Sequence, residues 1–147
     1  MVIVVKQRLA TATDVDRIKN FLKKNDLPDL GIEGFVQNFV LAEDEKEALV
    51  GVAGLELYGE SGLLRSVAVD KQFRGHGLGG KLVQAILRNA KVRGVKRLYL
   101  LTDGAGKYFE RLGFQAINRN DTDEAVRASQ EFTEICQTCT AMRMRLS

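Results

Sequence analysis

The chain has 147 residues, of which 45% are hydrophobic and 28% charged, and its formal net charge is +3. These values are typical of a globular protein, and the length suits one domain over residues 1–147. The weak charge without long basic runs argues against nucleic acid, and no apolar stretch reaches the ~18–20 residues of a membrane span.

The N-terminus has no signal-peptide pattern, so we expect a cytoplasmic protein that does not contact a membrane. Cys136 and Cys139 form a single C-x-x-C, and His76 is the only histidine. Zinc would need two further ligands, and a redox pair usually opens a helix after a strand. We therefore expect two ordinary thiols and no metal site.

The first half of the chain predicts a strand, two helices and then three antiparallel strands. Residues 2–9 are strand-like, and Thr13 with Asp16 can cap a helix that runs to about residue 24. A short helix is expected over residues 32–38. Strands are expected over residues 39–43, 48–58 and 63–69, joined by charged or glycine-containing turns.

The second half begins with a crossover between parallel strands. Apolar residues recur at helical spacing over residues 78–90, and residues 98–101 form an apolar run typical of a strand buried on both faces. Helices are then expected over residues 107–112 and 122–133, and strands over 114–117 and 142–146. The fold class is α+β, an α/β sandwich with a mostly antiparallel mixed sheet and one parallel βαβ unit.

A glycine-rich loop lies between the third antiparallel strand and the helix of the crossover. Arg74 directly precedes four glycines: Gly75, Gly77, Gly79 and Gly80. Glycine lets a backbone approach a ligand closely, and a helix start offers free N–H groups and a positive dipole end. The loop therefore predicts a cradle for a phosphate or pyrophosphate.

Two phosphate-binding motifs match this loop only in part. Residues 75–80 satisfy G-x-G-x-x-G, with Asp103 as a ribose-binding acid, but five residues separate Val69 from Gly75 and no further βα units follow. A nucleotide triphosphatase loop would use Lys81, but the next residue is Leu82 and the hydroxyl ligand for Mg²⁺ is missing.

A third interpretation accounts for the whole context. Gln72-x-x-Gly75-x-Gly77 with Leu78-Gly79, and the later segment Tyr108 to Phe114, resemble the acyl-CoA loop and the F-Y-E-K-L-G-F signature of the GNAT acetyltransferase superfamily. The resemblance implies a sheet of about seven strands with flanking helices, acetyl-CoA as co-substrate, and N-acetyltransferase activity. It covers nearly the whole chain.

The resemblance narrows to one branch of the superfamily. Residues 54–59, 63–66, 98–102 and 125–136 look like amino-acid acetyltransferases of the N-acetylglutamate-synthase type and N-acetyltransferases encoded with arsenic-resistance genes. Two positions depart from that branch, Gln137 in place of a proline and Asp103 within a threonine run. Both lie near where an acceptor could bind, so the resemblance leaves the acceptor open.

The resemblance also implies roles for individual residues. Backbone N–H groups of Arg74 to Gly80 would hold the pyrophosphate, and the edge formed by Val67, Ala68 and Val69 would hold the pantetheine arm. The CoA-binding set is Val67, Ala68, Val69, Arg74, Gly75, His76, Gly77, Leu78, Gly79, Gly80 and Phe109.

The acceptor side needs a base, an acid and a group for the substrate. Glu56 is the candidate general base, although strand alternation also allows an exposed residue. Arg65 could clamp a substrate carboxylate or form an ion pair. Phe109 occupies the usual tyrosine position, and Tyr108, about 100° away on a helix, is a weak candidate acid with packing as the alternative.

Three functions fit these patterns. The first is acetylation of the primary amine of a small molecule, an amino acid or an analogue. The alternatives are acetylation of a protein lysine or N-terminus, and a non-catalytic CoA-binding module, which Phe109 keeps open. The alternating final strand could also pair across a homodimer.

Overall fold

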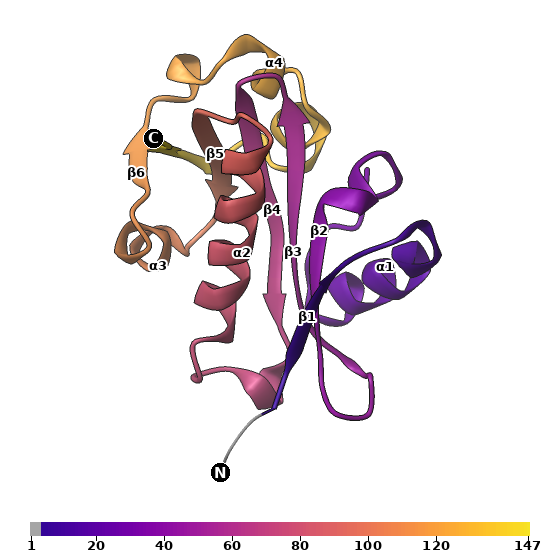
Figure 1. The fold of residues 1–147 in the computed structure, drawn as a ribbon. Coiled ribbons are helices and arrows are strands. Elements are labelled where there is room, and N and C mark those ends of the chain that lie inside the picture. The colour runs from indigo at the N-terminus through magenta and orange to yellow at the C-terminus, as the bar shows by residue number, and fades with distance from the viewer. Residues whose placement is uncertain (1–3) are drawn as a thin grey trace. The chain divides into compact units, whose positions relative to one another are not determined.

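The computed structural model describes residues 4–147, and Figure 1 shows the order of the elements. The strands are β1 Lys6–Leu9, β2 Phe39–Glu43, β3 Leu49–Tyr58, β4 Ser61–Val69, β5 Arg97–Thr102, β6 Gln115–Ile117 and β7 Thr140–Arg145. The α-helices are α1 Val15–Lys24, α2 Leu78–Val92, α3 Gly106–Arg111 and α4 Glu124–Arg127. The strand expected over residues 2–9 begins at Lys6, and residues 2 and 3 lie outside the described residues.

Over residues 4–147 the strands form a seven-stranded sheet in the order β1-β2-β3-β4-β5-β7-β6. β4 and β5 pair in parallel, with Ser61 opposite Arg97 and Leu63 opposite Tyr99, and α2 connects them along the chain. The pairs β1–β2, β2–β3, β5–β7 and β6–β7 are antiparallel. The prediction of a mostly antiparallel mixed sheet with a parallel βαβ unit is confirmed.

The residues group into two compact units. The first unit comprises Met1–Leu55 and Ser66–Asn89, and the second comprises Glu56–Arg65 and Ala90–Ser147. The boundary therefore falls inside β3 and inside β4. The expectation that residues 1–147 act as one domain stays a prediction.

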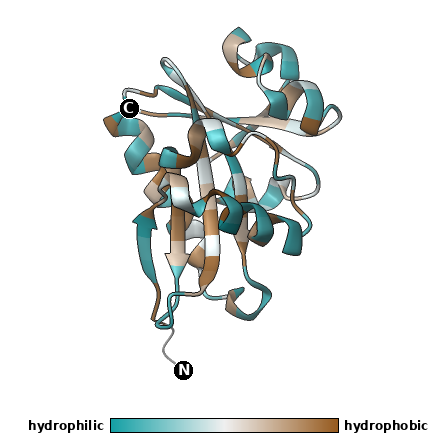
Figure 2. Cartoon of the chain, turned by 90° about the vertical axis from the view of Figure 1, so that its right-hand side faces the viewer, coloured by the Kyte–Doolittle hydropathy of each residue, from teal (hydrophilic) through white to brown (hydrophobic). Residues whose placement is uncertain are grey.

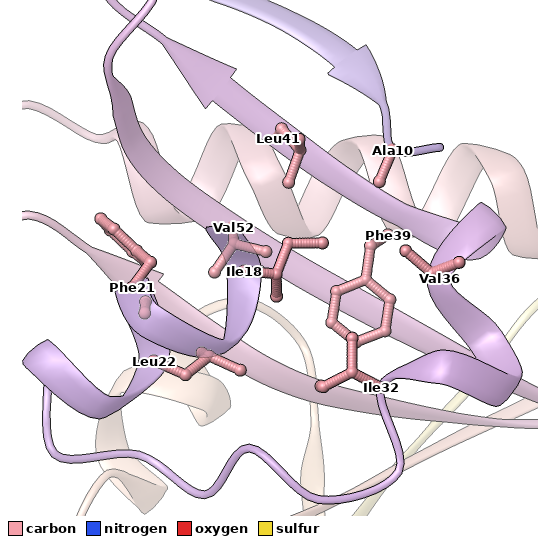
Figure 3. Packing of buried hydrophobic residues seen from close by; sticks show 10 residues of the cluster. Ala10, Ile18, Phe21, Leu22, Ile32, Val36, Phe39, Leu41 and Val52 are labelled. Carbon is pink, nitrogen blue, oxygen red and sulfur yellow. The ribbon is translucent and has the colours of Figure 1, made fainter. Parts of the chain in front are cut away.

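In the first unit, α1 and α2 cover opposite faces of β3. Ile18 and Leu22 of α1 are fully buried in a cluster that includes Val52 (Figure 3). Gly51 directly precedes Val52 in β3, and a Cβ atom added at Gly51 would lie 2.9 Å from Leu82 Cδ1 of α2. Because successive strand residues point to opposite faces, α1 packs on the Val52 face and α2 on the Gly51 face.

The start of α1 differs from the predicted cap. A 3₁₀ turn, Ala12–Asp14, precedes the helix, so the capping pair is Thr11 and Asp14 and not Thr13 and Asp16. The Asp14 carboxylate accepts a hydrogen bond from the Thr11 N–H at 2.8 Å and two from the Arg8 guanidinium at 2.9 Å. The Arg8 hydrogen bonds hold the pKa of Asp14 well below its usual range.

The second unit has its own core around β5. Leu63, Tyr99, Val126, Phe132 and Ala141 form a buried cluster. Residues 98–100 of β5 are buried, as expected of a strand covered on both faces. Figure 2 shows hydrophobic residues concentrated along the strands of the sheet, and hydrophilic residues on the outer faces of the helices.

Two of the expected helices are different in the structure. Residues 33–38 form a 3₁₀ helix, and the helix expected over residues 122–133 is wrong, because α4 ends at Arg127 and a π-helical turn follows at Glu131–Ile135. Ser129 lies between the two. Its hydroxyl accepts from the Phe132 N–H at 3.4 Å and its carbonyl accepts from the Thr133 hydroxyl at 2.9 Å. Such side-chain bonds compete with continuous helix.

Cys136 and Cys139 are joined by a disulfide, so the expectation of two ordinary thiols is wrong. The chain bends between the π-helical turn and β7, which brings the two Cα atoms to 5.5 Å, a separation that a disulfide can span. Arg119 donates hydrogen bonds to the carbonyl oxygens of Cys136 and Cys139, at 3.2 and 2.8 Å. The bend is thus held by a guanidinium as well as by the disulfide.

Candidate functional site

The glycine loop in the first unit has the conformation that its sequence requires. After β4 ends, the Asp70 carboxylate accepts a hydrogen bond from the Gln72 N–H at 3.0 Å and caps a 3₁₀ turn. Gly75 and Gly77 then adopt φ values of +84° and +78°, which other residues rarely take. An added Cβ would meet nothing within 4 Å at either glycine, so the backbone conformation selects glycine here.

Positively charged groups accompany this loop. α2 begins at Leu78, directly after the second of these glycines, and its 15 residues provide a positive dipole end. Arg74 is exposed, and it donates to the Val69 carbonyl at 3.0 Å and to Asn25 Oδ1 at 3.3 Å. The arginine is therefore fixed beside the loop. The loop can accept an anion through backbone N–H groups and this guanidinium.

A pocket borders the loop on the side of β1. It is lined by Val5, Gln7, Phe73, His76, Leu78 and Lys81. His76 is exposed and shares this lining with the Lys81 ammonium, so both face the same opening. The structure therefore places the one histidine of the chain beside the cationic side chain of Lys81.

The second half of β4 contains an unusual residue. Ser66 has φ +58°, in the left-handed region that non-glycine residues seldom occupy. The regular alternation of side chains along β4 is therefore interrupted at Ser66. Ala68 belongs to the buried core of the first unit, whereas Val67 and Val69 are half-buried.

The second unit contains a buried ion pair between β3 and β4. Arg65 Nη1 donates to Glu56 Oε2 at 2.8 Å, and the two side chains are only 1% and 3% exposed. The Tyr58 hydroxyl donates to Glu56 Oε1. The pKa of Tyr58 is raised by burial and by this hydrogen bond. The sequence-predicted base and substrate-binding residue are thus brought together, and Glu56 is not an exposed strand residue.

Sequence reasoning did not single out Glu131, which is half-buried. It begins the π-helical turn, and burial raises the pKa of its carboxyl, with the Glu56 charge adding to the effect and Arg65 opposing it. In the sequence, Glu131 was noted only as part of residues 125–136, which resemble one branch of the GNAT superfamily. A helix over residues 122–133 gave no reason to single out Glu131.

Tyr108 and Phe109 lie on α3 and make aromatic contacts. Their ring centroids are 5.1 Å apart in an edge-to-face arrangement, and Phe109 makes a similar contact with the buried Phe114 at 6.0 Å. Partial burial raises the pKa of Tyr108. Packing is therefore an observed role of both rings.

The remaining motif residues support neither alternative phosphate loop. Leu82 is fully buried and packs toward Gly51, and Asp103 is exposed. Over residues 4–147, no group of three or more His, Cys, Asp or Glu side chains is placed to hold a metal ion. In the same residues, no helix is long and apolar enough to cross a bilayer.

Comparison with known proteins decides between these interpretations. A family model described as an acetyltransferase (GNAT) domain matches residues 36–116, which is more than half of the chain. The chain belongs to the GNAT acetyltransferase family. The match includes the glycine loop, α2, β5 and α3 of this GNAT domain.

Curated relatives of this GNAT domain carry the name amino-acid acetyltransferase. The protein from Mycobacterium tuberculosis is 33% identical over 105 residues, 69% of this chain and 57% of that protein. The protein from Neisseria meningitidis is 29% identical over 98 residues, 65% of this chain and 22% of that protein. The chain therefore spans less than two thirds of the length of these relatives.

Solved structures share the fold. N-acetylglutamate synthase from Neisseria gonorrhoeae, complexed with coenzyme A and N-acetyl-glutamate, has a TM-score of 0.85 at 22% identity, covering 100% of this chain and 36% of that one. Rv2747 from Mycobacterium tuberculosis, in complex with CoA and NLQ, has a TM-score of 0.79 at 25% identity. The similarity covers 97% of this chain and 99% of that chain. The predicted GNAT fold is confirmed.

Proposed function

We propose that this GNAT domain transfers an acetyl group from acetyl-CoA to the primary amine of a small molecule, an amino acid or an analogue. The observation that carries the proposal is the glycine loop, whose two positive-φ glycines lead into the N-terminus of a 15-residue helix. Relatives named amino-acid acetyltransferase and structures bound to coenzyme A support it.

In this proposal the donor is held mainly by the backbone. N–H groups from Arg74 to Gly80 bind the pyrophosphate, and the guanidinium of Arg74 adds positive charge. Backbone groups of Val67 to Val69 bind the pantetheine amides as an added strand would. The left-handed Ser66 turns the backbone just before these residues, which suits a strand whose peptide groups serve a ligand.

The reaction is a direct attack within a ternary complex. The acceptor nitrogen forms a bond to the thioester carbonyl carbon, the C–S bond breaks, and CoA leaves as a thiolate. Glu56 is the proposed base for the ammonium proton, and Arg65 and Tyr58 fix its carboxylate through their hydrogen bonds. The role proposed for Arg65 is therefore to position Glu56, in place of the carboxylate clamp expected from the sequence.

The thiolate needs little assistance. A thiol of pKa ~8.5 costs only about 2 kcal/mol to release as a thiolate near pH 7. Tyr108 is the candidate acid, and its edge-to-face contact with Phe109 offers packing as the alternative role. Replacement by phenylalanine keeps the ring contact, so a loss of kcat in Tyr108→Phe would measure the hydroxyl alone.

The experiment is a steady-state assay of thiol release from acetyl-CoA against a panel of primary amines, with acetyl-CoA affinity measured separately by calorimetry. The proposal expects turnover with at least one small amine. Tight acetyl-CoA binding without turnover of any amine would leave a CoA-binding module. A cytoplasmic location and a homodimer stay predictions of the sequence.

A further inference from the structure

We propose that Cys136 and Cys139 form a reversible redox pair that exchanges with low-molecular-weight thiols and disulfides such as glutathione, and that Arg119 holds the pair in position to close. The inference goes beyond acetyl transfer and does not depend on it. It rests on the disulfide, on its place between the π-helical turn and β7, and on the other contacts that fix the two cysteines.

The disulfide closes a very short loop. Only two residues, Gln137 and Thr138, separate the cysteines. In the chain-entropy account, a disulfide stabilises a fold by restricting the unfolded chain, and this restriction grows with the number of residues in the loop. A loop of this size gains little, so stability alone is a weak reason for the pair.

Non-covalent contacts hold each cysteine independently of the disulfide. The Cys136 N–H donates to the Glu131 carbonyl at 2.9 Å. Thr140 directly follows Cys139 and begins β7, where it pairs with Thr102 of β5. We therefore expect the bend between the cysteines to persist after reduction, which leaves the two sulfurs near enough to close again.

Arg119 joins the two sides of this bend. Its Nη1 donates to the Cys136 carbonyl at 3.2 Å and to the Cys139 carbonyl at 2.8 Å, and its Nη2 donates to the Phe132 carbonyl at 3.1 Å. The guanidinium also lies 4.9 Å from the centre of the Phe132 ring, which belongs to the buried cluster of the second unit. Because one planar group bonds both cysteines, it keeps their sulfurs at a high effective concentration in the dithiol form.

The two cysteines differ in exposure, which sets the order of the exchange. Cys136 is half-buried, whereas Cys139 is only 7% exposed. An incoming small thiolate therefore attacks the sulfur of Cys136, the disulfide breaks, and Cys139 leaves as a thiolate that takes up a proton. A second small thiolate attacks the small-molecule sulfur of the mixed disulfide and releases Cys136, which is protonated in turn. Two small thiols are thereby oxidised to one small disulfide, and the pair gains two electrons and two protons.

The test is a redox titration of the full chain in buffers of reduced and oxidised glutathione, with free thiols trapped by alkylation and counted by intact mass. We expect one transition between dithiol and disulfide, at the same glutathione ratio whether the protein starts reduced or oxidised. Circular dichroism should show a folded chain on both sides of the transition. A disulfide that opens only when urea unfolds the chain, reduction that itself unfolds the chain, or a reduced chain that does not close again would each overturn the proposal.

Two variants separate the role of Arg119 from a general effect of charge. Arg119 and Arg127 both lie in the second unit, and Arg127 is exposed on α4. Arg119→Gln should lower the equilibrium constant for closing the disulfide at least fivefold and let the mixed disulfide accumulate, whereas Arg127→Gln should leave the constant within twofold. Equal effects of the two variants would mean that Arg119 does not hold the pair. If Arg119→Gln does not fold, Arg119→Lys replaces it, because it keeps the charge and loses the planar fork, and it should lower the constant at least threefold.

Discussion

The buried pair of Glu56 and Arg65 allows a quantitative prediction. Arg65→Met keeps most of the side-chain volume and removes the charge, which leaves the Glu56 carboxylate buried with the Tyr58 hydroxyl as its remaining partner. Exposed ion pairs contribute about 0–1 kcal/mol, whereas breaking a buried pair costs about 3–5 kcal/mol. With side chains 1% and 3% exposed, the larger range applies.

The assay is a double-mutant cycle followed by urea unfolding. Arg65→Met should lower the free energy of unfolding by about 3–5 kcal/mol, because it removes the charged partner of the buried Glu56 carboxylate. Glu56→Leu should also lower it, because the buried Arg65 guanidinium loses this carboxylate. The double variant removes both charges, so it should cost much less than the sum of the two single variants, with a coupling energy above about 2 kcal/mol. Additive effects, or a loss under about 1 kcal/mol in Arg65→Met, would refute this reasoning.

Three further predictions concern other parts of the chain. Arg74→Glu should weaken acetyl-CoA binding more than tenfold in calorimetry, and an unchanged affinity would mean that the glycine loop does not hold the pyrophosphate. Gly54→Ala should lower stability by about 1–3 kcal/mol in urea unfolding, because its Cβ would lie 2.6 Å from Cε1 and Cε2 of the fully buried Phe39. Gly34→Ala, with open space around its Cβ, is the control and should change stability by under 1 kcal/mol. Asp14→Asn should reduce stability by about 1 kcal/mol at pH 7 and flatten its loss below about pH 4, because the lowered pKa of Asp14 stabilises the fold above that pH; an unchanged acid profile would contradict this.

The parts of the fold that the sequence predicted well depend on local patterns. The apolar spacing of Ile18 and Leu22 fixed the buried face of α1, and the run at residues 98–101 indicated a strand buried on both faces. The loop conformation at Gly75 and Gly77 could also be predicted, because it too depends on local sequence. A positive φ is a property of one residue, and glycine is the residue that adopts it without strain.

The acceptor side depends on contacts between distant residues, so the sequence predicted less of it. Glu56 and Arg65 were identified one at a time, but their pairing depends on the register of two strands and on burial. The helix expected over residues 122–133 was wrong, because the Ser129 hydrogen bonds lie where the segment divides, and helical spacing does not reveal them. Ser66 is another such case, since serine in a strand-like run gives no sign of a left-handed φ.

This difference explains why similarity to known proteins supports the donor more firmly than the acceptor. Backbone N–H groups bind the same ligand whatever side chains the loop carries, provided that glycines keep its conformation. The fold itself is shared with solved structures at 22–25% identity, with TM-scores of 0.79–0.85. In the proposed function, acceptor recognition depends instead on side chains, and Glu56 and Arg65 are the two that the structure pairs. A single substitution can change such a side-chain site while the fold stays the same, so a panel of amine substrates measures acceptor choice more directly than further comparison of folds.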